Sequence, residues 1–139
     1  VRKTYIYRVW NSDAPCVFER KYVHAEPRPL DLDAMRRAAA QLCGQHEFSA
    51  FSTGKKTGRA ATRTIESIGI ECCGEEVRLT YTGDGFLYNM VRILTGTLLE
   101  VGQGKRTPES VRQTLEAKDR TQAGYTAPPQ GLCLMRVDY

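Results

Sequence analysis

The chain has 139 residues, of which 41% are hydrophobic and 26% are charged, and its formal net charge is +4. This length suits one domain with a hydrophobic core, and no stretch approaches the roughly 18 unbroken apolar residues of a membrane span. The mild positive charge permits a polyanionic partner without demonstrating one.

The first predicted elements are a strand and a helix joined by a long connection. Side chains alternate between two faces over residues 3–11, with the aromatic and β-branched bias of a β-strand. The connection contains three prolines and has at most a short strand near residues 16–18. Asp31 can cap a helix whose apolar residues recur at helical spacing until Gly44 ends it.

The middle of the chain predicts a loop followed by a hairpin. Residues 46–63 carry Phe48 and Phe51 into a loop rich in glycine, threonine and positive charge. Residues 63–73 and 76–82 are then predicted to be two strands joined by a short turn, and apolar residues alternate cleanly in the second. We expect these two strands to pair.

The last third of the chain predicts two helices and a strand. A glycine turn at residues 83–85 leads into the most apolar run of the chain, which we expect to be a helix ending near residues 102–104. Thr107, followed by a proline, is a good start for a second helix that ends near Lys118. Residues 131–139 form the last predicted strand.

This order of elements favours an α+β fold. Sequential pairing gives a largely antiparallel sheet with the helices packed on one face, in a single domain over residues 1–139. We expect the other face to carry Tyr5 and to be covered by a partner domain. The chain opens with Val1 and enters a strand at once, so we expect it to be a segment of a longer protein.

The cysteines indicate the redox setting. There are five, an odd number without the spacing of a disulfide framework, which favours reduced thiols and a cytoplasmic protein. Cys72 and Cys73 are adjacent and lack the two-residue spacer of a zinc knuckle, and both histidines lie far from them in the sequence. No metal site is therefore predicted.

Arg92 is the unusual residue of the apolar helix. The wide apolar stripe of this helix consists of Leu87, Met90, Val91, Leu94, Leu98 and Val101. Asn89, Arg92 and Gly96 lie on a separate narrow stripe. Because a glycine inside a helix costs about 1 kcal/mol relative to alanine, we expect another backbone or a substrate to approach closely at Gly96.

The spacing leaves two interpretations of Arg92 open. In the first, its side chain extends to water or pairs with an acid of the same chain, such as Asp84 or Asp138. In the second, its planar guanidinium serves a carboxylate or phosphate from elsewhere. A buried guanidinium without any partner would be strongly destabilising, so a central helix would require one.

Four segments in order resemble the tRNA pseudouridine synthase A (TruA) family. The segment "GFLYNMVRILTGTLLEVGQGK" resembles its Met-Val-Arg helix, and "KTYIYRVWN" resembles its Lys-x-Tyr-x-Tyr strand. The segment "HEFSAFS" resembles its Asp/Glu-Phe-x-x-Phe stretch, and "AKDRTQAGYTAPPQGLCLMRVDY" its closing loop and strand. Together they extend from Lys3 to Tyr139 and identify the chain as similar to the second half of these enzymes.

The resemblance implies that the nucleophile lies outside this chain. The family's catalytic aspartate sits in a Gly-Arg-Thr-Asp-x-Gly-Val motif of an earlier domain, and no aspartate here has that setting. The sequence "KDRT" at residues 118–121 belongs to the closing loop. We therefore expect the chain to be inactive without the N-terminal domain.

The resemblance also implies roles for particular side chains. Arg92 would pair with the aspartate of the earlier domain, and Tyr5 would pack on the target base with its hydroxyl free to hydrogen-bond. Leu132 would form an apolar wall, and Phe86 would help to line the same pocket. The implied reaction converts uridine to pseudouridine in the anticodon arm of tRNA, needs no cofactor, and is carried out by a homodimer.

Several alternatives remain open from the sequence. Lys55, Lys56, Arg59 and Arg63 either form a solvated turn or bind RNA phosphates, which would position the RNA without reading its sequence. The chain could instead be a stand-alone RNA-binding or protein-interaction module that kept the fold and lost the chemistry. A third reading is a ferredoxin-like domain with an unrelated ligand, in which Arg92 pairs with an acid of its own chain.

Overall fold

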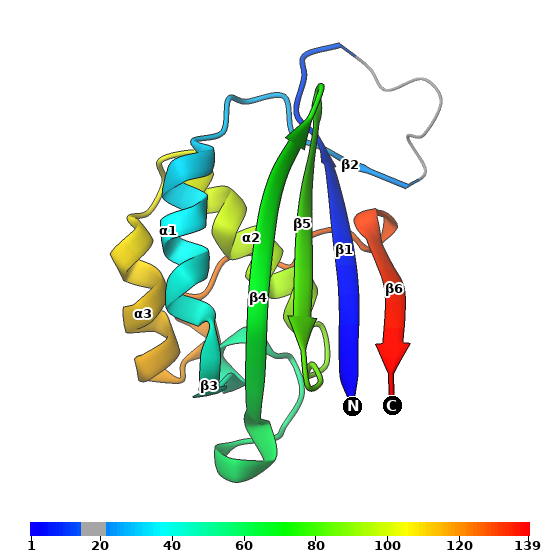
Figure 1. Cartoon of the computed structure of the whole chain (residues 1–139). Helices are drawn as coiled ribbons and strands as arrows, with labels where there is room; N and C mark the ends of the chain where they lie inside the picture. Colours follow the sequence, from blue (N-terminus) through cyan, green and yellow to red (C-terminus); the bar gives the residue numbers. More distant parts are fainter. Residues whose placement is uncertain (15–21) are drawn as a thin grey trace.

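The computed structural model describes residues 1–14 and 22–139 and shows a twisted sheet with helices on one face (Figure 1). The three helices are α1 (Leu32–Leu42), α2 (Met90–Gly102) and α3 (Pro108–Ala117). The strands are β1 (Arg2–Trp10), β2 (His24–Ala25), β3 (Gly44–Glu47), β4 (Thr62–Cys73), β5 (Glu76–Gly83) and β6 (Leu132–Asp138). The possible strand near residues 16–18 lies outside the described residues.

β1 pairs with three other strands of the sheet. The strand order is β2-β1-β5-β4-β3, and β6 also pairs with β1. β5 runs antiparallel along one edge of β1, while β6 and the short parallel β2 share the other edge at its two ends. Only the β1–β2 pair is parallel, so the predicted α+β fold with a largely antiparallel sheet is confirmed.

The core lies between the sheet and the helices. Its largest fully buried side chains are Tyr7, Tyr81, Phe48, Phe51, Met35, Leu42, Ile65, Leu79, Met90, Ile93, Leu94 and Leu98. Two predicted helix caps are also present: Asp31 accepts a hydrogen bond from the amide of Ala34 at 3.1 Å, and Thr107 accepts one from Ser110 at 3.2 Å. In the described part of the chain, no helix is both long and apolar enough to cross a membrane.

The expected placement of Tyr5 on the uncovered sheet face is wrong. Tyr5 alternates in phase with Tyr7 and Val9, and both of these are completely buried in the core beneath the helices. Tyr5 is partly buried and packs against the same core. The strand period showed that these residues share a face, but only the position of the helices decides which face it is.

The expected loop over residues 46–63 contains regular structure that its composition conceals. β3 pairs with β4, and two short 3-10 helices follow at Ser49–Phe51 and Gly58–Ala61. Phe48 and Phe51 are fully buried and attach this segment to the core. Residues 53–60, which follow these two anchors and precede β4, form the exposed part of the loop.

Candidate active site

Four of the residues predicted for the site line one small pocket. Tyr5 comes from β1, Phe86 and Arg92 come from the approach to α2 and its first turn, and Leu132 begins β6. The cavity has a volume of about 130 Å³. Its full lining is Tyr5, Phe86, Leu87, Asn89, Met90, Val91, Arg92 and Leu132. Residues separated by more than a hundred positions in the sequence thus meet because β6 pairs with β1 beside the start of α2.

Tyr5 and Phe86 form the aromatic side of the pocket. The rings of Tyr5 and Phe86 meet edge to face, with centroids 5.4 Å apart and planes at 90°. Beside them, Leu132 pairs with Tyr7 across the β1–β6 ladder and is partly buried against the core. These side chains give the pocket one aromatic wall and one aliphatic wall.

The guanidinium of Arg92 is the polar group of the pocket. Its Nε donates to the carbonyl oxygen of Ala127 at 2.7 Å, and its Nη1 donates to Oδ1 of Asn89 at 3.2 Å. The side chain is partly buried, so it neither points freely into solvent nor lies sealed in the core. Both partners are neutral acceptors, which orient the guanidinium without neutralising its charge.

The two acids considered as partners of Arg92 are engaged elsewhere. Asp84 accepts a hydrogen bond from the amide of Thr64 at 2.9 Å, and Asp138 accepts one from Nε of Arg136 at 2.9 Å. Over residues 1–14 and 22–139, no carboxylate forms an ion pair with Arg92. Within these residues, the interpretation that Arg92 pairs with an acid of its own chain is therefore wrong.

The loop that supplies Ala127 packs directly on α2. A Cβ added at Gly96 would lie 1.8 Å from the carbonyl oxygen of Tyr125, which explains a glycine inside this helix. Next to it, the amide of Gly124 donates to Oγ1 of Thr97 at 2.9 Å. The expected close approach at Gly96 is confirmed, and the approaching backbone is that of the chain itself.

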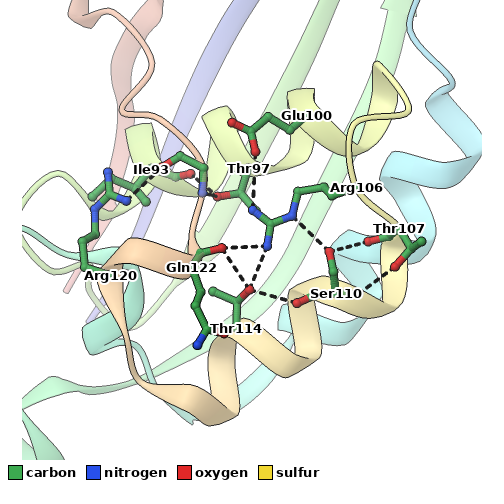
Figure 2. Close-up of polar contacts among 10 residues, drawn as sticks. Ile93, Thr97, Glu100, Arg106, Thr107, Ser110, Thr114, Arg120 and Gln122 are labelled. Atoms are coloured by element: carbon green, nitrogen blue, oxygen red, sulfur yellow. Dashed lines mark hydrogen bonds and ion pairs between the residues drawn. The ribbon is translucent and has the colours of Figure 1, made fainter.

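Two further arginines, Arg106 and Arg120, donate hydrogen bonds to this loop. Arg120 donates to the carbonyl oxygen of Gly124 and to Oγ1 of Thr126. Figure 2 shows Arg106 donating to Ser110 and Thr114 of α3 and to the carbonyl oxygen of Gln122 in the loop, with Glu100 of α2 beside it. This network ties α2, α3 and the loop together.

Tyr7 fixes the other end of the loop. Its hydroxyl donates to the carbonyl oxygen of Pro128 at 2.5 Å, and Gly131 lies so close to its ring that an added Cβ would be 2.7 Å away. Burial raises the pKa of Tyr7 well above its ordinary value, so this hydroxyl keeps its proton as a donor. Leu132, directly after Gly131, is thereby held in the lining of the pocket.

Comparison with known proteins identifies the family of the chain. The sequence profile of the tRNA pseudouridine synthase family matches residues 38–139, which is most of the chain. The chain belongs to the tRNA pseudouridine synthase family.

Individual relatives in the family match almost the whole chain. It is 42% identical to tRNA pseudouridine synthase A 2 of Clostridium perfringens over 99% of this chain and 56% of that protein. It is 46% identical to tRNA pseudouridine synthase A of Brevibacillus brevis, again over 99% and 56%. With the enzyme of the same name from Halalkalibacterium halodurans, the identity is 48% over 94% of this chain and 49% of the relative. The chain thus spans about half the length of the curated relatives it matches.

The four basic residues considered for phosphate contacts lie apart from the pocket lining. Lys55 and Lys56 are exposed between the two short 3-10 helices, and Arg59 is exposed within the second of these helices. Arg63 is partly buried, and its Nη1 donates to the carbonyl oxygens of Ala60 and Thr62, at 3.0 and 2.8 Å. The structure therefore separates three solvated cations from an arginine that stabilises the end of the loop.

The sequence missed three groups that shape the pocket: the side chain of Asn89, the carbonyl oxygen of Ala127 and the hydroxyl of Tyr7. Asn89 had a usable signal, because it lies three residues before Arg92 on the same helical stripe. The carbonyl of Ala127 had none, since every residue has a carbonyl and only the packing of the loop brings this one to Arg92.

Proposed function

We propose that this chain is the C-terminal half of a tRNA pseudouridine synthase that converts uridine to pseudouridine in the anticodon arm of tRNA. In this proposal an upstream domain delivers the catalytic aspartate, and residues 1–139 provide Arg92 and the walls that hold the base. The relatives bear the name of this activity and are about twice as long as the chain, which supports both parts of the proposal.

The observation that carries the proposal is the unneutralised charge of Arg92. Its guanidinium is partly buried, oriented by Asn89 and Ala127, and without a carboxylate partner among residues 1–14 and 22–139. An arginine held in this way favours an anion that arrives from outside the described residues. The start of α2, with its positive dipole end, lies at the same pocket and favours negative charge there as well.

The size of the pocket supports a site completed by a second domain. Its 130 Å³ is below the roughly 300–1,000 Å³ of pockets that enclose a whole small ligand. Tyr5 and Leu132 would form one side of the enclosure, and the upstream domain would close the other. A base between these walls would be shielded from water while its bond to the sugar is open.

The proposed reaction uses few groups of this chain. The target uridine leaves its stack and enters the pocket, where Tyr5 offers a ring face and Leu132 an apolar wall. The aspartate, kept ionised and aimed by Arg92, assists cleavage of the bond between uracil and ribose. The uracil then turns within the pocket and rejoins the sugar through a ring carbon, which loses its proton, while the ring nitrogen released from the sugar gains one. Phe86 restrains the aromatic ring of Tyr5 during this movement.

In this proposal the tRNA also contacts residues outside the pocket. We assign Lys55, Lys56 and Arg59 to phosphate contacts, since their side chains are exposed on a loop that is anchored at both ends. The partners of the complete enzyme in this proposal are tRNA and a second copy of the same protein.

A conversion assay tests the proposal. The complete protein, containing the upstream domain, should convert uridine to pseudouridine in tRNA, and Arg92→Ala should lower kcat by about 100-fold or more, since its guanidinium aims the reacting carboxylate. Arg112→Ala is the matched control, because Arg112 is an exposed arginine that pairs with Glu116 on α3. Full activity of Arg92→Ala would refute its role, and tRNA binding without conversion by the parent protein would favour the non-catalytic RNA-binding module.

A further inference from the structure

Asn89 has an unusual backbone conformation directly before α2. Its φ of 60° and ψ of 9° place it in the left-handed region. In the described ranges, Lys118, with a φ of 55°, is the one other non-glycine residue with positive φ. This region is uncommon for residues with a side chain, although asparagine tolerates it better than most. Glycine would be the conformationally easier choice, so a side chain at this position suggests a use for it.

The Asn89 side chain does not serve the helix. An asparagine at a helix start commonly accepts a hydrogen bond from an amide of the first turn, but Asn89 makes no such bond. Its Oδ1 instead accepts from Nη1 of Arg92 at 3.2 Å, and its Nδ2 donates to Oγ1 of Thr53 at 3.1 Å. Since a guanidinium can only donate, the amide oxygen must face Arg92 and the amide nitrogen must face Thr53.

These contacts restrict the guanidinium from two sides. Ala127 accepts from Nε of Arg92, and Asn89 accepts from Nη1. Nη2 makes no hydrogen bond within residues 1–14 and 22–139, so it is the guanidinium nitrogen that keeps both of its N–H groups for an incoming carboxylate. We propose that Asn89 is a positioning residue that aims the Arg92 guanidinium at the reacting carboxylate, an inference that rests on the function proposed above.

The second amide contact connects this arrangement to the basic loop. Oγ of Ser52 and the amide of Thr53 both donate to the carbonyl oxygen of Tyr88, at 3.1 and 3.4 Å. Thr53 then holds Asn89, and the chain continues into the exposed Lys55 and Lys56. Asn89 is thus fixed by the segment to which we assign the phosphate contacts, which orients its oxygen toward Arg92.

Two substitutions separate positioning from simple packing. Asn89→Gly keeps the left-handed backbone and removes the side chain. Asn89→Asp keeps the size and the acceptor but places a carboxylate of the chain itself on Arg92, where it competes with the reacting aspartate. If Asn89 only packs, the isosteric aspartate should be the milder change; if it positions Arg92, the aspartate should be the more damaging one.

We therefore expect Asn89→Asp to lower kcat more than Asn89→Gly does, although aspartate is closer to asparagine in size. In the complete protein, Asn89→Gly should lower kcat about tenfold, the equivalent of one hydrogen bond to a charged group. Asn89→Asp should lower it by about 100-fold or more, since it neutralises the group that aims the aspartate. KM for tRNA should stay near that of the parent, because Tyr5 and Leu132, to which we assign the contacts with the base, are unchanged. Lys118→Gly, at the other left-handed position, should keep the parent kcat.

A second measurement does not depend on catalysis. Nuclear magnetic resonance of the complete protein should show Arg92 side-chain protons exchanging with water about fivefold faster in Asn89→Gly than in the parent. Lys118→Gly should leave this rate unchanged. Equal exchange in the parent and Asn89→Gly, or a smaller loss of kcat in Asn89→Asp than in Asn89→Gly, would overturn the inference. An inactive parent would refute the proposed function, and the exchange rates would still decide whether Asn89 holds Arg92.

Discussion

The amide of Ala127 donates to the carbonyl oxygen of Arg92 at 3.0 Å, while Nε of Arg92 donates to the carbonyl oxygen of Ala127 at 2.7 Å. Two residues that are 35 positions apart are thus joined through both backbone and side chain. This double contact couples the orientation of the guanidinium to the position of the loop on α2. Substitutions that move the loop should therefore affect Arg92 without touching the pocket.

Gly96→Ala should displace this loop. The new Cβ would lie 1.8 Å from the carbonyl oxygen of Tyr125, a backbone atom that can move only with the loop. We expect the free energy of unfolding to fall by about 1–3 kcal/mol, as for other overpacked sites, when measured by urea denaturation. In the complete protein kcat should fall as well, because Ala127 would move away from Arg92.

Gly69→Ala is the control for this change. Its added Cβ would come no nearer than 3.9 Å to the Thr80 side chain, an ordinary contact, so stability should be equal to or slightly above that of the parent. Equal stability of the two alanine variants would contradict the proposed packing of the loop on Gly96.

Arg106→Met should destabilise the fold far more than a comparable surface substitution. The side chains of Arg106 and Glu100 are 13% and 24% exposed, and the same guanidinium also donates to Ser110, Thr114 and the loop (Figure 2). Removing one partner of a partly buried pair leaves the others unsatisfied, and we expect a loss of about 3 kcal/mol by urea denaturation.

Arg112→Met serves as the matched surface substitution. Arg112 and Glu116 are 52% and 68% exposed, so their ion pair is screened by water and its loss should change stability by no more than about 0.5 kcal/mol. If both variants lost the same stability, the network around Arg106 would not have the structural role assigned to it.

The ionisation of Glu76 should make the stability of the fold depend on pH. Burial alone would raise the pKa of Glu76, but hydrogen bonds from Arg8 and Arg78 outweigh it and hold this pKa below its ordinary value of 4.5. The folded state thus binds this proton less readily than the unfolded state. Its stabilising contribution is present above about pH 4.5 and is lost as the pH falls through the lower folded value.

Glu76→Gln should remove this dependence. We expect lower stability at neutral pH and a flatter decline below pH 4.5 in urea denaturation series, because the titrating group is gone. Glu116→Gln, at an exposed carboxylate, should follow the parent curve. A Glu76→Gln curve parallel to that of the parent would show that other groups control acid unfolding.

Reversing Lys55 and Lys56 to glutamate should weaken tRNA binding by the complete protein. Each lost phosphate contact reduces the release of counterions, so the slope of log affinity against log salt should become shallower by up to about 0.9 per contact. Lys105→Glu, an exposed change between α2 and α3, is the control. If the variant bound tRNA as tightly as the parent at every salt concentration, the loop would be only a solvated turn.

Much of the fold could be predicted from local patterns. Hydrophobic spacing indicated the strands that became β1, β4, β5 and β6 and all three helices, and the caps at Asp31 and Thr107 are present. β3 was missed because it is short and polar, and its pairing with β4 becomes evident only in the folded sheet. The wrong face was expected for Tyr5 because alternation shows which residues share a face but not which layer covers it.

The sequence by itself determined the α+β order of elements, the family, and the presence of an arginine in the most apolar helix. Only the tertiary structure decided what that arginine contacts. Asp84 and Asp138 were plausible partners by sequence, yet folding directs them to Thr64 and Arg136. The physical reason is one of range: helical and strand periods depend on neighbouring residues, whereas the acceptor that faces a side chain depends on which distant segments pack together.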